Sequence, residues 1–354
     1  MADSITIRGM QSRAARFLKV DTFEELARVL RKKPMQLAAI AANPIYDEFY
    51  IPKKNGKKRH IENPNPQLKK IQRRLNEYLQ AVYFFHRPAC AFGFLSAPKN
   101  DPEPRNILTN AERHVGCTWM LNVDMKDFFH QISFPSVKEL FESPMLGFRE
   151  EVSMALASIC CYKGRLPMGA PTSPIISNIA TIPLDQDLSN YAEERRFCYT
   201  RYADDLSFSA QEEITQEHFQ EIERWVNAYD LVLNQKKIKF FPPDGLPKEV
   251  TGLIVGQDKV YLSEEYQTQL RGAISHLSIV VDAQHLTPTG HNQRSLWVGE
   301  LTQQVRGKLE FARRILGEDT DQFIEYEMAF DEAVEPPEHF GPLSWLDFGY
   351  APIN

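Results

Sequence analysis

Tyr199-Thr-Arg-Tyr-Ala-Asp-Asp-Leu-Ser-Phe-Ser209 places two adjacent carboxylates between two runs of strand-forming residues. On both sides of Asp204 and Asp205, residues alternate in the period-2 pattern of a half-buried hairpin. Aspartate tolerates the backbone angles of a tight turn, so the pattern predicts a hairpin with the aspartate pair at its tip. Adjacent like charges repel each other, and Mg²⁺, which binds carboxylate oxygens and substrate phosphates, would relieve that repulsion. Taken alone, the stretch also fits an Asp-rich surface turn.

A second candidate carboxylate follows an apolar run. Trp119-Met-Leu-Asn-Val-Asp-Met-Lys-Asp-Phe-Phe129 predicts a buried strand that ends in Asp124, and a buried strand presents its last residue rigidly. If this strand lies beside the hairpin, Asp124 converges with Asp204 and Asp205. Three carboxylates can hold two Mg²⁺ ions about 3.5–4 Å apart, one activating an attacking hydroxyl and one stabilising a leaving pyrophosphate. Such a site transfers phosphoryl groups.

Length and composition limit the number of domains and the class of protein to which the chain can belong. A chain of 354 residues with 43% hydrophobic and 25% charged residues can form two or three domains with ordinary cores. We find neither an apolar run long enough for a bilayer nor a signal peptide, so we expect a cytoplasmic protein without a membrane partner. Five cysteines without paired spacing predict free thiols rather than a zinc site or a disulfide framework.

The net charge of −6 is unevenly distributed. Residues 318–354 contain ten acidic residues and no Lys or Arg, which leaves residues 1–317 with a net charge of +4. The aromatic residues among these acids suit a segment that docks on another protein. The alternative is a tail that folds back on the basic surface of the body.

Two loops carry features of a nucleotide site. Ile51-Pro-Lys-Lys-Asn-Gly-Lys-Lys-Arg-His-Ile61 predicts a hairpin with an Asn-Gly turn, and its cations suit a triphosphate or a template backbone. A solvated edge hairpin fits the same residues equally well. The Pro-rich loop from Gly164 opens into a helix predicted from Ile175 to Tyr191, and Gly169 would allow close backbone approach, although an ordinary connector is the alternative.

Helices are predicted at both ends of the chain. Asp21 or Thr22 can cap a helix from Phe23, and a second helix starts near Met35. We expect a further helical region from Ser136 to Leu156. Residues 263–316 predict two or more helices, one capped by Ser263 and one from about residue 293 to 316, and their cations suit the binding of duplex RNA through its phosphates.

Three of these motifs, taken in their order, resemble the palm motifs of reverse transcriptases. They are Val-Asp-Met-Lys-Asp-Phe-Phe around Asp124, Leu-Pro-Met-Gly-Ala-Pro-Thr-Ser-Pro around Met168, and Tyr-Ala-Asp-Asp. Asn110-Ala-Glu-Arg-His114 and Val250-Thr-Gly252 are similar to signatures of retron reverse transcriptases. The resemblance covers residues 50–260.

The resemblance implies an α+β fold, a right-hand polymerase with fingers, a palm with an antiparallel sheet, and a helical thumb. The expected division is an N-terminal helical region at 1–50, fingers at 51–114, a palm at 115–260 with 136–180 contributing to the fingers, a thumb at 261–317 and an acidic tail at 318–354.

The resemblance also assigns roles to single residues. Asp124, Asp204 and Asp205 would be catalytic and bind two Mg²⁺ ions. Lys237, with Lys236 second, would protonate pyrophosphate, although a solvated charge pair is the alternative. The expected dNTP-binding residues are Lys58, Arg59, Asp127, Phe128, Phe129, Met168 and Gly169, with Phe129 as the aromatic gate that selects dNTPs over NTPs. The expected RNA-binding residues are Asn110, His114, Val250, Thr251, Gly252, Arg306 and Arg313.

One position departs from the family pattern. The family's loop usually reads Leu-Pro-Gln-Gly, and Met168 stands in place of the glutamine. Methionine offers shape and polarizability but no amide hydrogen bonds. We expect activity to be retained, while fidelity and nucleotide affinity are the properties that this change puts in question.

A retron-like enzyme would copy part of a structured non-coding RNA into single-stranded DNA (msDNA), primed from a 2′-hydroxyl within that RNA. The resemblance further implies a role in defence against phage with a separate effector protein. Two alternatives stay open: another class of bacterial reverse transcriptase, against which the motifs at Asn110 and Val250 argue, and an RNA- or DNA-binding scaffold that restrains a toxic effector.

Overall fold

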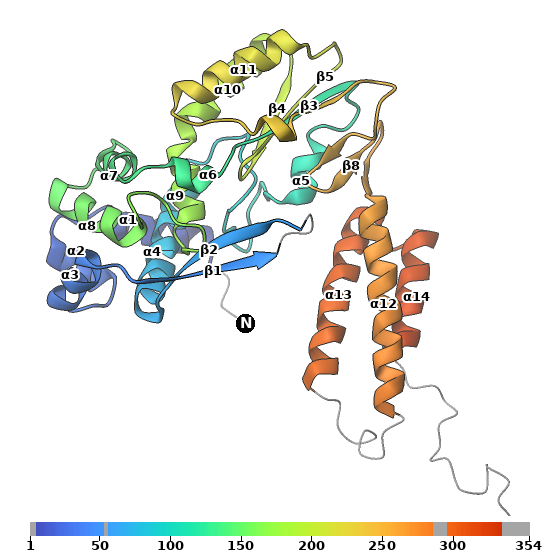
Figure 1. The fold of residues 1–354 in the computed structure, drawn as a ribbon, viewed down its shortest axis with the longest axis horizontal. Coiled ribbons are helices and arrows are strands. Elements are labelled where there is room, and N and C mark those ends of the chain that lie inside the picture. Colours follow the sequence, from blue (N-terminus) through green and yellow to red (C-terminus); the bar gives the residue numbers. More distant parts are fainter. Residues whose placement is uncertain (1–4, 53–55, 286–295, 335–354) are drawn as a thin grey trace, which may run out of the picture. The chain divides into compact units, whose positions relative to one another are not determined.

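A computed structural model of the protein describes residues 5–52, 56–285 and 296–334, and its backbone divides into two units, residues 1–251 and 252–354 (Figure 1). The first unit begins with helices α1 (Ile7–Phe17), α2 (Phe23–Val29) and α3 (Pro34–Ala42). Helix α2 begins after Thr22, whose Oγ1 accepts a hydrogen bond from the Glu25 N–H at 3.3 Å. The predicted N-terminal helical region is therefore present.

A basic hairpin follows these helices. Strands β1 (Tyr46–Pro52) and β2 (Lys58–Pro64) pair antiparallel, with Tyr50 opposite His60, as the Asn-Gly motif predicts. Residues 53–55, which include Lys53, Lys54 and the first turn residue, lie outside the described residues. Helix α4 (Pro66–Phe84) starts after Asn65, whose side chain caps it, and buries one apolar face in the core.

The central element of the first unit is a four-stranded antiparallel sheet. Its strand order is β4 (Cys198–Tyr202), β5 (Asp205–Ala210), β3 (Trp119–Asp124) and β6 (Lys239–Phe241). Strand β3 lies inside the sheet, between β5 and β6, which explains its apolar sequence. The antiparallel palm sheet expected from the motifs is confirmed, and with its helices it makes the fold α+β.

Helices surround this sheet and complete the core. They are α5 (Ile107–Glu112), α6 (Phe128–Gln131), α7 (Phe134–Glu142), α8 (Glu150–Cys160), α9 (Ser173–Ala180), α10 (Ile182–Glu194) and α11 (Gln216–Ala228). Figure 1 shows α10 and α11 beside strands β4 and β5, and residues of both helices pack into the same hydrophobic core as the strands. The short 3₁₀ turn η1 (Gln235–Lys237) and strand β7 (Glu249–Val250) end the unit.

The helical region predicted from Ser136 to Leu156 is present as two helices, because Gly147 adopts φ 67° in the connection between α7 and α8. A second helix prediction needs correction. The predicted helix from Ile175 to Tyr191 is also divided, at Thr181, because the proline in the first turn of α10 has no N–H to continue the hydrogen bonds of α9.

The second unit contains a hairpin and three helices. Strands β8 (Leu253–Val255) and β9 (Val260–Leu262) precede α12 (Glu264–His285), α13 (Leu296–Leu316) and α14 (Asp321–Val334). The Ser263 Oγ accepts from the Tyr266 N–H at 3.3 Å, as expected of a cap, and α12 packs against both α13 and α14.

Helix α14 changes the interpretation of the acidic tail. Its side chains Phe323, Tyr326 and Phe330 are buried within the second unit. A segment whose aromatic residues are already packed in its own chain cannot offer them to a partner, so this part of the docking prediction is wrong. Residues 335–354 of the predicted tail lie outside the described residues.

Two other predictions concern the chemistry of the whole chain. All five cysteines are free thiols, as their spacing predicted. Among the described helices, none combines the length and the apolar character that crossing a membrane requires.

Candidate active site

Three aspartates meet at one end of the central sheet. Asp124, the last residue of β3, stands directly opposite Asp205, the first residue of β5, in the antiparallel register. Asp204 precedes Asp205 in the turn, and its carbonyl accepts a hydrogen bond from the Met125 N–H at 2.9 Å. The convergence of the two sequence motifs is therefore confirmed.

The turn that carries the aspartates is held by buried groups. Ala203 adopts φ 59°, and its carbonyl accepts a hydrogen bond from Nη1 of Arg201 at 3.1 Å. Gly93 lies against this turn so closely that a Cβ there would be 2.5 Å from the Ala203 nitrogen. The turn therefore has little freedom to move.

Arg201 supports the site from within the core, and the sequence motifs did not single it out. Its side chain is fully buried and makes two hydrogen bonds of 2.8 and 2.6 Å to the equally buried Asp185 carboxylate, and a third of 2.9 Å to Asn178. An arginine in the middle of a predicted buried strand was the available signal, because such a charge requires a partner. The partner itself, on α10, could not be read from the sequence.

Burial, together with the charges of neighbouring carboxylates, raises the pKa values of Asp204 and Asp205. Burial, followed by the charge of Asp124, raises the pKa of Asp204. Loss of hydration, followed by the charges of Asp204 and Asp124, raises the pKa of Asp205 to about 7. Asp205 as a residue is exposed, so the surrounding protein removes only part of the hydration of its carboxyl group. These directions are those expected when several carboxylates share one site.

Two residues near η1 contact Asp124. The Lys237 Nζ lies 2.5 Å from one Asp124 carboxylate oxygen, and the Asn234 side-chain amide donates to the other at 3.1 Å. Burial works against the charge of Lys237, but the contact with Asp124 raises the pKa of the ammonium group. Lys236 is exposed and lies on the same turn, so the geometry favours Lys237 over its neighbour.

The candidate nucleotide-binding residues lie on three segments. Lys58 and Arg59 are exposed on β2, and the charge of Arg59 acts on Asp204. Phe128 and Phe129 are buried in α6, and the Phe129 ring lies 5.8 Å from that of Phe94. Asp127 precedes α6 with φ 44° and is exposed.

The third segment is the loop with Met168 and Gly169. It lies against β2, because the Glu62 N–H donates to the Met168 carbonyl at 2.8 Å. Gly169 adopts φ 135°, and a Cβ there would be 2.8 Å from the Glu62 carbonyl oxygen. Only glycine fits this close approach.

The Glu62 side chain joins all three segments. Its carboxylate accepts two hydrogen bonds of 3.0 Å from Arg165 and one of 3.0 Å from the Met168 N–H, and it lies 3.1 Å from Nε2 of His130 on α6. Glu62 itself belongs to β2 and is fully buried. One carboxylate thus connects the basic hairpin, the Met168 loop and the Phe129 helix.

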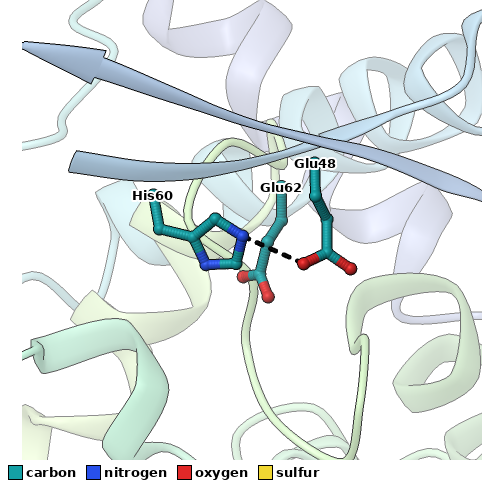
Figure 2. A group of neighbouring side chains, drawn as sticks. All are labelled: Glu48, His60 and Glu62. Atoms are coloured by element: carbon teal, nitrogen blue, oxygen red, sulfur yellow. Dashed lines mark ion pairs between the residues drawn. The ribbon is translucent and has the colours of Figure 1, made fainter. Parts of the chain in front are cut away.

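Glu62 also belongs to a group that could be taken for a metal site. In the described part of the chain, Glu48, His60 and Glu62 bring their ligating atoms within 4.8 Å of one another (Figure 2). Glu48 binds His60 at 2.9 Å and Lys163 at 2.5 Å. Because Lys163 and the Tyr162 hydroxyl bind the Glu48 carboxylate, and Arg165 and the Met168 N–H bind that of Glu62, these side chains form a structural network.

Three of the candidate RNA-binding residues are buried. Asn110 and His114 are 1% exposed, and the His114 ring bonds Ser209 at 2.7 Å and Thr200 at 2.8 Å. Val250 is also fully buried. The side chains of these three residues are covered by protein in this structure, and their assignment to RNA binding stays a prediction.

Four other candidates keep some exposure. Thr251 is partly exposed with φ 50°, and Gly252 is exposed with φ 87°. Arg306 and Arg313 are exposed on α13, but Arg313 pairs with Glu318 and lies 3.8 Å from Glu310. That pairing reduces the charge that Arg313 can offer to a phosphate.

Comparisons with known proteins agree with the motifs. Residues 51–265 match the family described as reverse transcriptase (RNA-dependent DNA polymerase). The chain is 33% identical over 259 residues to the retron Ec86 reverse transcriptase of Escherichia coli, an alignment that covers 69% of this chain and 73% of that one. It is 34% identical over 235 residues to the retron Mx162 reverse transcriptase of Myxococcus xanthus, with 59% and 46% covered.

Solved structures were compared as well. A telomerase structure from Candida albicans covers 84% of this chain and 61% of its own, with 12% identity and a TM-score of 0.45. The family match spans more than half of the chain, and the match to the Escherichia coli relative spans more than two thirds of both proteins. The chain therefore belongs to the reverse transcriptase family, and within it to the retron-type RNA-directed DNA polymerases.

Proposed function

We propose that this protein copies part of a cognate structured non-coding RNA into single-stranded DNA by metal-dependent nucleotidyl transfer. The observation that carries the proposal is the pairing of Asp124 with Asp205 across neighbouring strands, with Asp204 in the adjoining turn. The motifs at Asn110 and Val250 and the retron relatives support a retron RNA as the template.

The donor set fits Mg²⁺. Three carboxylates offer only oxygen ligands, which this ion prefers. Burial and the charges of neighbouring carboxylates raise the pKa values of Asp204 and Asp205 and so work against their charged forms, which a bound cation would favour. When bound, two Mg²⁺ ions would activate the attacking hydroxyl and stabilise the leaving pyrophosphate.

The chain's own residues position the reactants. Lys58 and Arg59 hold the triphosphate, and the Phe129 ring, fixed by its neighbours Phe94 and Phe128, excludes a 2′-hydroxyl from the sugar. The oxygen of the RNA 2′-hydroxyl, and then of each new 3′-hydroxyl, bonds to the α-phosphorus of a dNTP while the bond to pyrophosphate breaks. The hydroxyl proton leaves to solvent, and Lys237 donates a proton to pyrophosphate.

The test is co-expression of the protein with the non-coding RNA encoded beside its gene, followed by a denaturing gel of extracted nucleic acid. We expect an RNase-resistant, DNase-sensitive band that disappears in the Asp204→Asn/Asp205→Asn double variant. Asp244→Asn, an exposed aspartate in a loop, is the matched control and should keep the band.

Stability provides a second readout. Because the two carboxylates repel each other, the double asparagine variant should unfold at a temperature no lower than the wild type in metal-free buffer. If the wild-type protein binds the RNA but makes no DNA, polymerisation is excluded, and the restraint of a toxic effector by an RNA-bound scaffold becomes the better account.

The proposal also includes a biological role for the protein in the cell. The protein acts in the cytoplasm in phage defence, together with a separate effector protein, as the retron resemblance implies. Phage plating on cells with the complete operon tests this role. Loss of protection in the Asp204→Asn strain is expected, and full protection in that strain would show that DNA synthesis is not what the defence requires.

A further inference from the structure

Arginine and lysine side chains line three adjoining recesses on the N-terminal helices and α4. The recesses have volumes of about 340, 360 and 480 Å³. The first two share Arg31 and Arg74, and the last two share Lys32 and Lys70, so together they form one continuous groove. We call it the basic groove, and its cationic lining is Arg13, Arg16, Arg31, Lys32, Lys70, Arg73 and Arg74.

The positive charge of the groove is poorly neutralised. Among the described residues that line the recesses, the one acidic residue is Glu77, which lines two of the three. It lies 3.5 Å from Nη1 of Arg13, and both side chains are partly exposed, so this pair is weak. Arg74 donates to the Val29 carbonyl at 2.6 Å and to the Tyr78 hydroxyl at 3.4 Å, and neither acceptor carries a charge.

The N-terminal part of the sequence, which contains the groove residues, is strongly basic as a whole. Residues 1–84 contain 17 Lys and Arg but 8 Asp and Glu, a net charge of +9 in a protein whose total is −6. Concentrated positive charge on one segment attracts polyanions from solution. Figure 1 shows helices α1 and α2 well separated from strands β4 and β5, so the groove is distinct from the carboxylate site.

We propose that the basic groove binds the sugar–phosphate backbone of RNA outside the catalytic site. The proposal rests on the function proposed above, because an enzyme that copies part of a structured RNA must hold the part that it does not copy. Arginine binds phosphate through two parallel N–H donors, which suits a recess better than a flat surface. RNA is favoured over DNA because the RNA is present before any DNA is made.

The experiment compares two variants with the same change in charge. The groove variant is Arg16→Gln/Arg31→Gln/Lys70→Gln/Arg73→Gln. The control variant is Arg8→Gln/Lys19→Gln/Arg28→Gln/Lys33→Gln, which removes four exposed cations of the same region that line none of the three recesses. The dissociation constant for an RNA hairpin with a single-stranded extension is measured over a salt series, with a DNA hairpin of the same sequence in parallel.

The groove variant should bind the RNA hairpin at least about tenfold more weakly at low salt. The slope of log affinity against log salt should fall by about 0.7–0.9 for each phosphate that the groove no longer neutralises. The control variant should change much less. Equal decreases in affinity for both variants would overturn the proposal, because long-range charge would then explain the binding. A larger decrease for the DNA hairpin would overturn the choice of RNA.

A separate assay distinguishes this proposal from the proposed function. Extension of a short primer on a short RNA template, which occupies only the carboxylate site, should proceed at wild-type rate in both variants at saturating template. If the wild-type protein fails to extend the primer, the proposed function fails, while the binding comparison still tests the groove. If the groove variant extends the primer poorly although it is folded, the groove belongs to the catalytic site and the proposal is wrong.

Discussion

Arg201 illustrates how a single charged residue can hold a catalytic turn in place. It lies in a strand whose neighbours are buried, and it has 0% exposure together with its partner Asp185. Burial of two charges is costly unless they are fully hydrogen-bonded, and removal of one partner leaves the other uncompensated. Because Arg201 also donates to the Ala203 carbonyl, its effect extends to the Asp204 turn.

We predict that Asp185→Leu and Arg201→Met will each destabilise the protein by about 3–5 kcal/mol. The double variant should regain most of that stability, because no unpaired charge remains. Its primer extension should stay low, however, because the Ala203 carbonyl has no donor in that variant. Urea unfolding and extension assays on all four proteins check this. Additive decreases in stability, or full activity in the double variant, would contradict it.

His114 gives a prediction about pH. Burial, followed by the charge of Arg113, lowers the pKa of His114 to about 4. The unfolded chain takes up this proton near pH 6.5, whereas the folded chain takes it up only near pH 4. The unfolded state therefore binds more protons between these values, so the free energy of unfolding should fall as the pH falls from 6.5 to 4, by on the order of 3 kcal/mol.

Denaturant unfolding at several pH values measures this effect. His114→Gln, which keeps a side chain able to hydrogen-bond Ser209 and Thr200, should be less stable at neutral pH but should lose part of the decline in acid. The same decline in the variant and the wild type would show that other groups cause it.

At the scale of elements, Glu62 connects three segments that are far apart in the sequence. Strand β2 carries Lys58, Arg59 and Glu62 itself, and α6 and the Met168 loop each contribute a partner to the Glu62 carboxylate. We infer that Glu62 is a positioning residue: it sets the spacing of the three segments without contacting the nucleotide.

We predict that Glu62→Gln will raise the KM for dNTPs about tenfold, the effect of losing one hydrogen bond between charged groups at about 1.5 kcal/mol. The turnover number should change less, because the three aspartates proposed to bind the metal ions stay in place. Glu48→Gln is the matched control, since Glu48 belongs to the same group but is partly exposed and lacks the bond to the loop. Steady-state kinetics with one varied dNTP would decide. A fall in turnover at unchanged KM would contradict the inference.

Helix boundaries show where local sequence was insufficient. The caps at Thr22, Asn65 and Ser263 use short side chains that the pattern identifies. The break at Thr181 was missed because the apolar periodicity continues through it. Pro183 was the signal, since a proline within an apolar helical pattern interrupts or bends the helix.

At the scale of the whole molecule, the end of the chain divides into two parts with different roles. Helix α14 packs Phe323, Tyr326 and Phe330 against its own unit, so it belongs to the helical unit rather than to an independent tail. The acidic residues of α14 therefore contribute charge to a folded unit, and only residues 335–354 keep the docking hypothesis open.

We predict that a chain ending at Gly317 will lose stability in its helical unit, because the apolar faces that α12 and α13 turn toward α14 become exposed. A chain ending at Val334 retains the described packing and should melt as the full-length protein does. Thermal unfolding of the two truncated proteins tests this, with limited proteolysis to locate the change. Equal melting temperatures for both truncations would contradict it.

A pull-down then tests docking with the protein that ends at Val334. If residues 335–354 bind the effector, this protein should fold normally and lose the partner. Retention of every stable partner would exclude docking by these residues.

The sequence alone determined the class of the protein and predicted the chemistry of its carboxylate site. Period-2 alternation around Asp204 and Asp205, an apolar strand ending in Asp124 and the order of the motifs were sufficient, because strand pairing and carboxylate chemistry depend on residue types at fixed spacing. Only the tertiary structure showed that Asn110 and His114 are buried, that Arg201 pairs with Asp185, and that Glu62 connects three segments. These facts depend on which distant residues meet, and spacing along the chain does not contain that information.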